Sequence, residues 1–453
     1  EHDSDGGYRT RVEAFMDVIR GFRRRGMPLR LTGKPTMPDI FTLNRSVDLT
    51  KGVLWIPPMH EATSRLFAAA FRGAGIESWA LPPEDEEDLL LGKQCSRGCE
   101  CLPMTLTLGA MVKKSAHNGC SRKDNILFMP TAEGPCRFGQ YILLDRKAFW
   151  NSGIDAVEIL APSSLNSYQG IDEETRRAMM HGLLAGDILL KLVTKIRPYE
   201  ITAGDTDDLF EQSLRLLEKE LEAGRDLRKV LPMIVEDFAR IPRRYEWRPL
   251  VGIVGEIYVR CNRFANGDLI RTIERSGGEA WLSPIHEWIS YTMYLQHYMA
   301  KQQGFSLFGQ GESLLKNLYF HQIEKSYYRV ADRLLADRHE PPIGEIIAEG
   351  SRYLPIDFSG EAILTIGRTI LFARQGARLV VNTAPFGCMP GTITSSLFLE
   401  LKDSLGIPIV TQFYDGDLDI NDKVNAILKI ILSGEGAAGL SDDGDRERFS
   451  ADA

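Results

Sequence analysis

Two stretches of this chain alternate short apolar runs with helical patterns, and this alternation restricts the fold more than any other feature. In the first stretch, the apolar run 52–57 is followed by a helical pattern over 60–73 and by a second run at 76–81. A strand, a helix and a strand in this order predict a β-α-β unit with parallel strands. Further runs at 125–129 and 156–160 predict the third and fourth strands.

A second α/β unit is expected in the C-terminal half of the chain. It starts with the strand 249–256, and the later segments are a helix at 267–276, a strand at 279–282, a helix at 361–375, a strand at 377–382, a helix at 395–405 and a strand at 408–413. The segment Gly75-Ile-Glu-Ser-Trp-Ala-Leu-Pro82 resembles Gly278-Glu-Ala-Trp-Leu-Ser-Pro284. This short match indicates two related units, although chance is the alternative.

The predicted fold class is therefore α/β, with two Rossmann-like domains, parallel sheets and a helical insertion or lid. The expected boundaries are an N-terminal arm at 1–48, a first α/β domain with the cysteine cluster at 49–170, a helical region at 171–246, a second α/β domain at 247–432 with a helical segment at 285–375, and a disordered tail at 433–453.

Length and charge limit the class of protein. A chain of 453 residues is long enough for two or three domains. A net charge of −8 argues against nucleic-acid binding as the main activity. Because no apolar run reaches the ~18–20 residues that span a bilayer, and because the N-terminus lacks a secretory signal, we expect a cytoplasmic protein without a membrane span.

Cysteine placement is the strongest chemical signal. Cys95, Cys99 and Cys101 lie in one turn-rich segment, while Cys136 and Cys388 lie in loops framed by glycine and proline. Cys101 enters a predicted helix, and the other two loops each follow a buried strand. Because ligands of open α/β sheets bind at the carboxyl ends of the strands, we expect these segments to converge on one metal centre.

Thiolates suit iron–sulfur clusters or zinc. The chain lacks the paired Cys-x2-Cys spacing typical of zinc ribbons, which favours an iron–sulfur cluster between the two domains. Structural burial is the alternative for any single cysteine. Cys120 lies in a polar loop and is interpreted as incidental, whereas the role of Cys261 stays open.

Four motifs carry a resemblance to a known family. The chain resembles the 2-hydroxyacyl-CoA dehydratase and benzoyl-CoA reductase-like superfamily over roughly residues 50–432. It is most similar to the C-terminal module of large activase-related proteins and to double-cubane cluster proteins. The motifs are Gly92-Lys-Gln-Cys-Ser-Arg-Gly-Cys-Glu-Cys101-Leu-Pro103, Met129-Pro-Thr-Ala-Glu-Gly-Pro-Cys136-Arg-Phe-Gly-Gln-Tyr141, Val254-Gly-Glu-Ile-Tyr-Val-Arg260 and Asn382-Thr-Ala-Pro-Phe-Gly-Cys388-Met-Pro-Gly391.

The resemblance implies an oxygen-sensitive cluster held by Cys101, Cys136 and Cys388, a homodimer, and a separate ATP-hydrolysing activase that supplies low-potential electrons. The chain itself has no Walker A sequence, as this division of labour requires. Cys95 and Cys99 are additions to the family pattern. With Cys261 they would complete the thiolates of a double-cubane [8Fe-9S] cluster, and the alternative is a single [4Fe-4S] cluster.

Other residues of these motifs are candidates for supporting roles. Glu256 is the expected acid, and Arg260 would hold an anionic group, with an internal ion pair between them as the alternative. Arg137 would offset the charge of the cluster, while Gly134 and Gly387 would let the backbone approach it. The function expected is an iron–sulfur reductase component acting on a small molecule. The alternatives are a 2-hydroxyacyl-CoA dehydratase-type subunit and a non-catalytic electron-transfer or scaffold protein.

Overall fold

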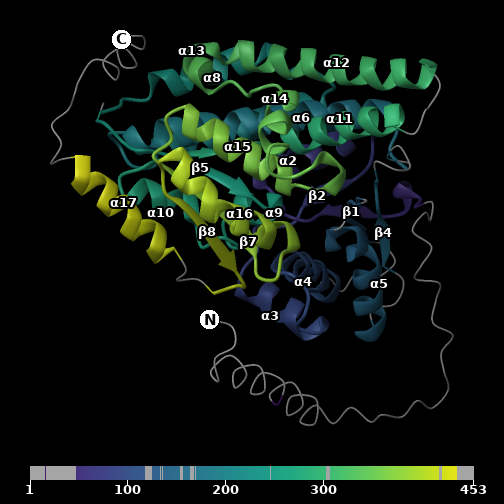
Figure 1. Ribbon diagram of the computed structural model, residues 1–453. Coiled ribbons are helices and arrows are strands. Elements are labelled where there is room, and N and C mark those ends of the chain that lie inside the picture. The colour runs from purple at the N-terminus through teal and green to yellow at the C-terminus, as the bar shows by residue number, and fades with distance from the viewer. Residues whose placement is uncertain are drawn as a thin grey trace. The chain divides into compact units, whose positions relative to one another are not determined.

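Two parallel four-stranded sheets carry the fold of this protein, which we describe from a computed structural model (Figure 1). The structure describes Met16 and residues 47–117, 125–132, 134, 136–153, 157–163, 168, 170–244, 246–302, 307–417 and 421–435. The chain divides into two units, Glu1–Thr42 and Leu43–Ala453. In the first unit only Met16 is described. The predicted disordered tail lies almost wholly outside the described residues.

The first sheet confirms the four strands expected in the N-terminal half. They are β1 (Val53–Ile56), β2 (Ser78–Ala80), β3 (Asn125–Phe128) and β4 (Glu158–Leu160), in the order β2-β1-β3-β4. All neighbours are parallel, and Trp55 of β1 lies opposite Trp79 of β2. Strand β3 is buried along its whole length, which explains its uninterrupted apolar sequence.

The second sheet repeats this topology. Its strands are β5 (Leu250–Gly255), β6 (Glu279–Leu282), β7 (Leu379–Pro385) and β8 (Ile409–Tyr414), in the order β6-β5-β7-β8. In each half, therefore, the first strand lies inside the sheet and the second lies at an edge. The matching segments around Trp79 and Trp281 are these two edge strands. The α/β class with two parallel sheets is thus as predicted.

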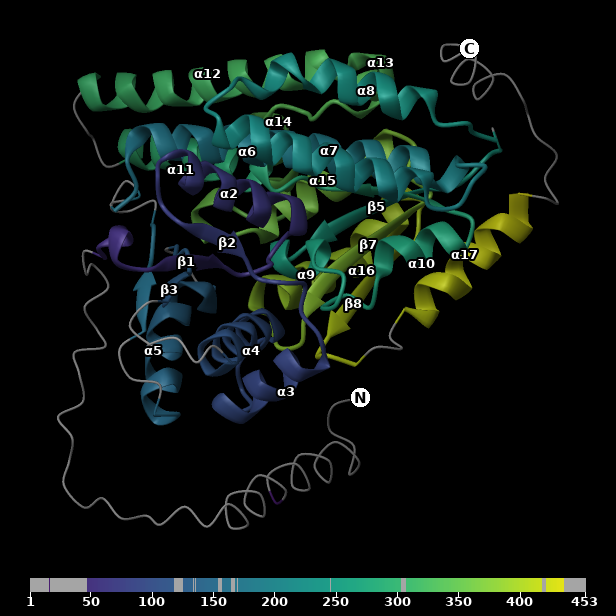
Figure 2. The ribbon, with the colours of Figure 1, turned by 180° about the vertical axis from the view of Figure 1, so that it is seen from behind.

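Helices connect and cover the strands (Figure 2). In the N-terminal half they are α2 (Glu61–Gly73), α3 (Glu86–Cys95), α4 (Leu102–His117) and α5 (Tyr141–Asn151). In the C-terminal half they are α9 (Ile257–Cys261), α10 (Leu269–Arg275), α11 (His286–Gln302), α12 (Leu307–Val330), α13 (Asp332–Leu335), α14 (Ile343–Gly350), α15 (Ala362–Arg374), α16 (Met389–Leu405) and α17 (Asp422–Glu435). Helices α3 and α5 are additions to the predicted pattern. None of the helices in the described part of the chain is both long and apolar enough to cross a membrane.

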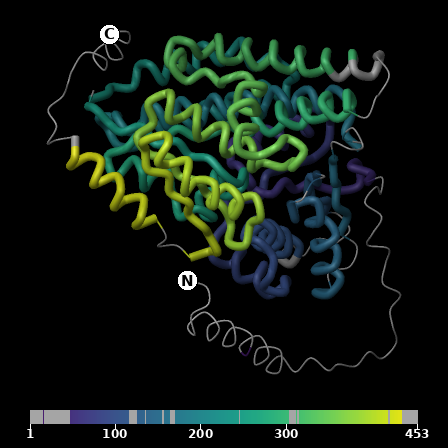
Figure 3. The backbone as a smooth tube through the Cα atoms, viewed as in Figure 1, coloured from purple at the N-terminus to yellow at the C-terminus, as the bar shows by residue number. Residues whose placement is uncertain are grey.

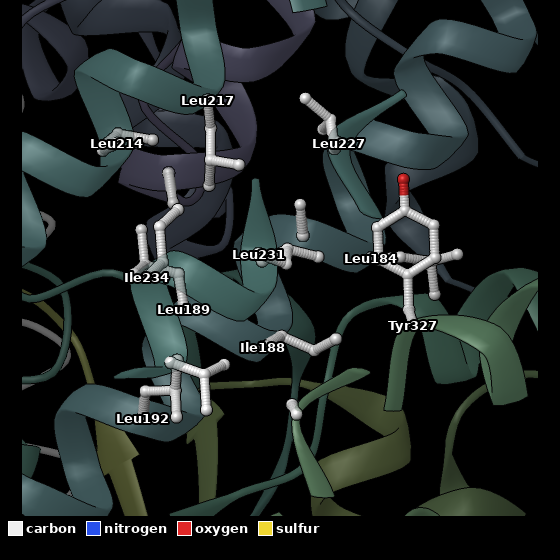
Figure 4. Packing of buried hydrophobic residues seen from close by; sticks show 14 of the residues in the cluster. Leu184, Ile188, Leu189, Leu192, Leu214, Leu217, Leu227, Leu231, Ile234 and Tyr327 are labelled. Carbon is white, nitrogen blue, oxygen red and sulfur yellow. The ribbon is translucent and has the colours of Figure 1, made fainter. Parts of the chain in front are cut away.

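The predicted helical region between the two sheets consists of α6 (Glu173–Ile196), α7 (Asp205–Glu222) and α8 (Leu231–Arg240). Figure 3 traces the chain from the first sheet through this region to the second. Figure 4 shows the leucines and isoleucines of these helices packed against each other and against Tyr327 of α12. Burying each such side chain contributes roughly 1.5–3 kcal/mol. Because α6 is part of the main apolar core, the expectation of a lid for this segment is wrong.

Two buried carboxylates contribute to the polar contacts between the halves of the Leu43–Ala453 unit. On α6, the buried Asp187 accepts hydrogen bonds from the backbone N–H groups of Ile285 and His286, directly after β6. After β2, the buried Glu84 accepts a hydrogen bond from Asn262, whose amide also donates to the carbonyl oxygen of Pro58. These contacts fix the loops that follow the strands of both sheets.

Candidate functional site

Three cysteines lie where loops pass into helices at the carboxyl ends of the strands. Cys101 directly precedes α4, Cys136 follows β3, and Cys388 follows β7. Cys136 caps a short 3-10 helix, η3 (Arg137–Gln140), and Cys388 is the N-cap residue of α16. The sequence placed Cys388 in a loop ahead of a helix beginning at Ser395, but Pro390 at the start of α16 allows the helix to begin directly after the cysteine.

Each of these three sulfur atoms accepts a hydrogen bond from a backbone N–H group. Gly391 N donates to Cys388 Sγ over 3.4 Å, and Phe138 N donates to Cys136 Sγ over 3.5 Å. The Sγ of Cys101 accepts the N–H group of Met104. Donors of this kind stabilise a thiolate and are one of the means by which proteins tune sulfur ligands.

Tyr141 holds the first of these thiols. Its hydroxyl group lies 2.7 Å from Cys101 Sγ, and both residues are buried. Burial, and then the charge that Cys101 would carry as a thiolate, raises the pKa of Tyr141 well above its ordinary value, so the phenol keeps its proton at neutral pH. Tyr141 closes the second sequence motif, but nothing in the sequence assigned it this role.

Charge on a neighbouring thiol contributes to the raised pKa of two of these cysteines. Ionisation of Cys101 raises the pKa of Cys136, and ionisation of Cys136 raises the pKa of Cys388. Desolvation is the larger cause, and the pKa of Cys136 reaches about 12. The protein alone therefore keeps these groups as thiols at neutral pH, and a bound cation would be needed to make them thiolates.

Two carboxylates lie beside the thiols. Glu256 is the N-cap residue of α9 and accepts the backbone N–H groups of Tyr258 and Val259. Glu361, just before α15, accepts the N–H group of Ile257. The charges of both carboxylates raise the pKa values of Cys136 and Cys388. Desolvation, followed by the charge of Glu256, raises the pKa of Glu361 to about 8, and desolvation also raises the pKa of Glu256.

Glu361 is the residue that the sequence did not indicate. It belongs to none of the motifs, and it lies far along the chain from the cysteine loops. The Cys136 loop approaches its neighbourhood at Gly134, where an added Cβ atom would come within 3.4 Å of the Ser359 hydroxyl oxygen. Only the folded chain places this carboxylate beside the thiols.

Arg260 lies behind Glu256. Its guanidinium donates to the carbonyl oxygens of Gly255 (2.8 Å) and Pro284 (3.0 Å) and is buried. Among the ion pairs of the described residues, none joins Arg260 to Glu256. The positive charge still lowers the pKa of Glu256, against the larger effect of desolvation. Arg260 therefore braces the loops after β5 and β6 and contributes its charge from a distance.

The remaining motif residues frame the site. The exposed Arg137 donates from Nη1 to the carbonyl oxygen of Cys99 over 2.6 Å, and its charge lowers the pKa of Cys101. Gly134 and Gly387 have φ angles of 124° and 72°. Residues other than glycine rarely adopt positive φ angles, so glycine at these two positions lets both cysteine loops turn sharply.

The additional cysteines have other contacts. Cys95, the last residue of α3, packs against the apolar cluster that contains Cys101, and its sulfur lies 3.4 Å from the Ser152 hydroxyl oxygen, while Cys99 is exposed. Cys261 packs against the apolar cluster under the second sheet, and burial raises its pKa to about 12. Cys120 lies outside the described residues.

Thiols are the donors that iron–sulfur clusters use. Cys101, Cys136 and Cys388, each with a backbone N–H group directed at its sulfur, are the residues that would hold such a cluster. Among the described residues, no group of three or more histidine, cysteine, aspartate and glutamate side chains is placed to hold a metal ion.

The chain matches none of the protein-family models and none of the curated proteins with which it was compared.

Proposed function

We propose that this protein is an iron–sulfur reductase component, with one cluster bound by Cys101, Cys136 and Cys388. The observation that carries the proposal is that three thiols from loops far apart in the sequence are each hydrogen-bonded to a backbone N–H group. The effect of Cys101 on the pKa of Cys136, and of Cys136 on the pKa of Cys388, supports a shared ligand in place of three separate structural roles. The cluster would supply electrons at low potential.

The chain's own residues would supply the proton. Glu361 and Glu256 lie beside the thiols, and desolvation keeps the pKa of Glu361 at about 8, so this carboxyl group carries a proton at neutral pH. A protonated carboxyl group next to a reduced centre can act as a general acid toward a small-molecule substrate. Arg260 holds the loop that bears Glu256, and its fixed charge favours an anionic substrate group.

The electron donor in this proposal is an ATP-hydrolysing activase, either a separate protein or a module fused to this chain, and this sequence shows no Walker A motif. A cytoplasmic location and a homodimeric assembly belong to the same proposal. It further specifies a single [4Fe-4S] cluster. This choice rests on Cys95, whose sulfur contacts Ser152, and on Cys261, which packs in a separate apolar cluster.

Iron and acid-labile sulfide measured on protein purified without oxygen test the proposal. We expect about four iron atoms per chain. Replacing Cys101, Cys136 or Cys388 with serine should remove most of the iron. Cys99→Ser is the matched control, because Cys99 is exposed like Cys136 but, among the described residues, no backbone N–H group donates to its sulfur, so the change should leave the iron content unchanged.

The outcomes separate the parts of the proposal. About eight iron atoms, lost with Cys99→Ser, would replace the single cluster with a double cubane. Anaerobic protein that binds zinc and no iron, or that keeps its iron in all three serine variants, would contradict the iron–sulfur assignment itself.

A further inference from the structure

His60 is a buried histidine at the end of β1 that the proposed function does not use. It is the N-cap residue of α2 and is 5% exposed. Its counterpart in the second half is Glu256, which follows β5 and is the N-cap residue of α9. Because β1 and β5 hold the same place in their sheets, the two residues lie at equivalent carboxyl ends of strands, where open α/β sheets bind their ligands.

The loop that carries His60 contacts both the surroundings of the first thiol and the second half of the fold. Met59 packs against the apolar cluster that contains Cys101, and also against the cluster that contains Tyr258 of α9. In the same loop, the carbonyl oxygen of Pro58 accepts a hydrogen bond over 3.0 Å from the residue directly after α9. The loop is therefore fixed from two sides.

The tautomer of His60 follows from its contacts with Thr63. The backbone nitrogen of Thr63 lies 3.3 Å from Nδ1, and the Thr63 hydroxyl oxygen lies 2.8 Å from the same atom. Since a backbone N–H group can only donate, Nδ1 is the acceptor and the proton of a neutral ring is on Nε2. No hydrogen bond within the described part of the chain involves Nε2, and this atom is not sealed from solvent.

Burial keeps this imidazole neutral. Desolvation lowers the pKa of His60, the charge of Asp187 opposes this effect, and the charge of Arg260 lowers the pKa further. A neutral imidazole at the N-terminus of a helix is a hydrogen-bond donor that keeps its proton, and such a donor can polarise an oxygen atom of a ligand. Capping of α2 uses only Nδ1, so Nε2 is left for this purpose.

We propose that His60 donates a hydrogen bond from Nε2 to an oxygen atom of the small molecule that the site binds. The charge of Arg260 lowers the pKa of both His60 and Glu256, so an anionic group near these two residues is favoured. His60 would hold this group without transferring a proton. The inference rests on the proposed function, in which the site binds a small molecule with an anionic group.

Calorimetric titration of formate into the full chain, purified without oxygen, tests the proposal. Formate is a small anion with two acceptor oxygens, and we expect a dissociation constant on the order of 1 mM. His60→Asn should weaken binding about 10-fold, because the asparagine oxygen can still cap α2 but no donor remains at the place of Nε2. His60→Gln, whose amide nitrogen reaches that place, should bind within about 3-fold of the wild-type protein.

His181→Asn is the matched control, because His181 is also partly or wholly shielded from solvent but packs against Tyr327 in the helical region. It should bind formate like the wild-type protein. A role in capping alone predicts the reverse order for the His60 variants, with Asn normal and Gln impaired. Melting temperatures check that each variant is folded.

Two results would overturn the proposal: a wild-type protein that binds no formate up to about 100 mM, or a folded His60→Asn variant with wild-type affinity. Iron content measured on the same samples reports on the proposed function separately. Formate binding that depends on His60 in a protein without iron would contradict the iron–sulfur assignment alone. An iron-loaded protein whose formate affinity ignores His60 would contradict this inference alone.

Discussion

Gly109→Ala offers a direct test of how the cysteine-bearing hairpin is built. Helices α3 and α4 are joined by the cysteine loop and pack with their backbones in contact at two glycines. A methyl group at Gly109 would overlap the backbone carbonyl oxygen of Asp88 and come within 2.6 Å of its carbonyl carbon. On the other helix, Gly92 meets the backbone of Thr105 in the same way. Since backbone atoms cannot rotate aside, the helices must separate.

The expected cost follows from that separation. Ordinary contacts of a Cβ atom begin at 3.4 Å and the added atom would lie 1.8 Å from the Asp88 oxygen, so the helices must move apart by about 1.6 Å. A gap of that size forfeits at least a quarter to a half of each contact energy along the seam, and overpacking of this kind costs about 1–3 kcal/mol. Alanine regains up to ~1 kcal/mol of helix propensity. The net loss of unfolding free energy should be about 2 kcal/mol, or roughly 2 °C in melting temperature for a unit of this size.

Gly311→Ala provides a control of opposite sign. Gly311 lies in α12, and an added Cβ atom there meets nothing within 4 Å. Helix propensity alone should therefore raise the stability by up to ~1 kcal/mol. Thermal and urea unfolding of the two variants measure the difference. The reasoning is refuted if Gly109→Ala melts at or above the wild-type temperature, or if both variants shift in the same direction.

Three further predictions concern buried charges. Arg368 is buried against Glu287 and Glu340, so Arg368→Met should lower the unfolding free energy by about 3–5 kcal/mol in urea, because it removes the partner of the buried Glu287 and leaves Glu340 to Lys191 and Tyr328; a loss below ~1 kcal/mol would contradict this. Burial raises the pKa of Glu84 to about 7, so between pH ~4.5 and ~7 the Glu84 carboxyl group keeps its proton in the folded state and loses it in the unfolded state. As the pH rises through this window, about 3 kcal/mol of unfolding free energy should be lost. Glu84→Gln should flatten the pH profile of the melting temperature. Asp145 is buried with no partner for either carboxylate oxygen, so Asp145→Leu should raise the melting temperature, by removing about 1–3 kcal/mol of desolvation cost; a fall would show that the carboxyl group is needed.

Much of the fold could be predicted because buried parallel strands have continuous apolar sequences, which glycine and proline residues delimit. Strands β5 and β7 are fully buried, and both were expected within a few residues of their ends. Helix α3 carries glutamate and aspartate in its first turn and buries only a few residues, so its sequence resembles a loop. It is defined instead by its N-terminal cap, where the Asp85 side chain accepts the Asp88 N–H group and Asp88 accepts the Asp85 N–H group.

The sequence could predict those residues of the candidate site that directly follow a strand. Cys136 and Cys388 follow buried strands, and the carboxyl ends of parallel strands share one edge of a sheet. Glu361 lies before a helix and not after a strand, so no such rule places it near the thiols. Its position depends on how α15 packs beneath the second sheet, which is a property of the tertiary structure alone.

The two sheets share one strand order, and this order explains the positions of Cys136 and Cys388 but not that of Cys101. Strands β3 and β7 occupy the same place in their sheets, and each leads to a cysteine whose sulfur accepts a helix N–H group. Strands β1 and β5 likewise lead to the N-cap residues His60 and Glu256. Repetition therefore supplies two thiols, which are too few to hold the proposed cluster. The third thiol, Cys101, comes from the α3–α4 hairpin, which follows β2, whereas the helices that follow β6 contain no cysteine. In the function proposed above, the hairpin is the addition that completes the ligand set, so the glycine contacts that close it should matter to iron binding as well as to stability.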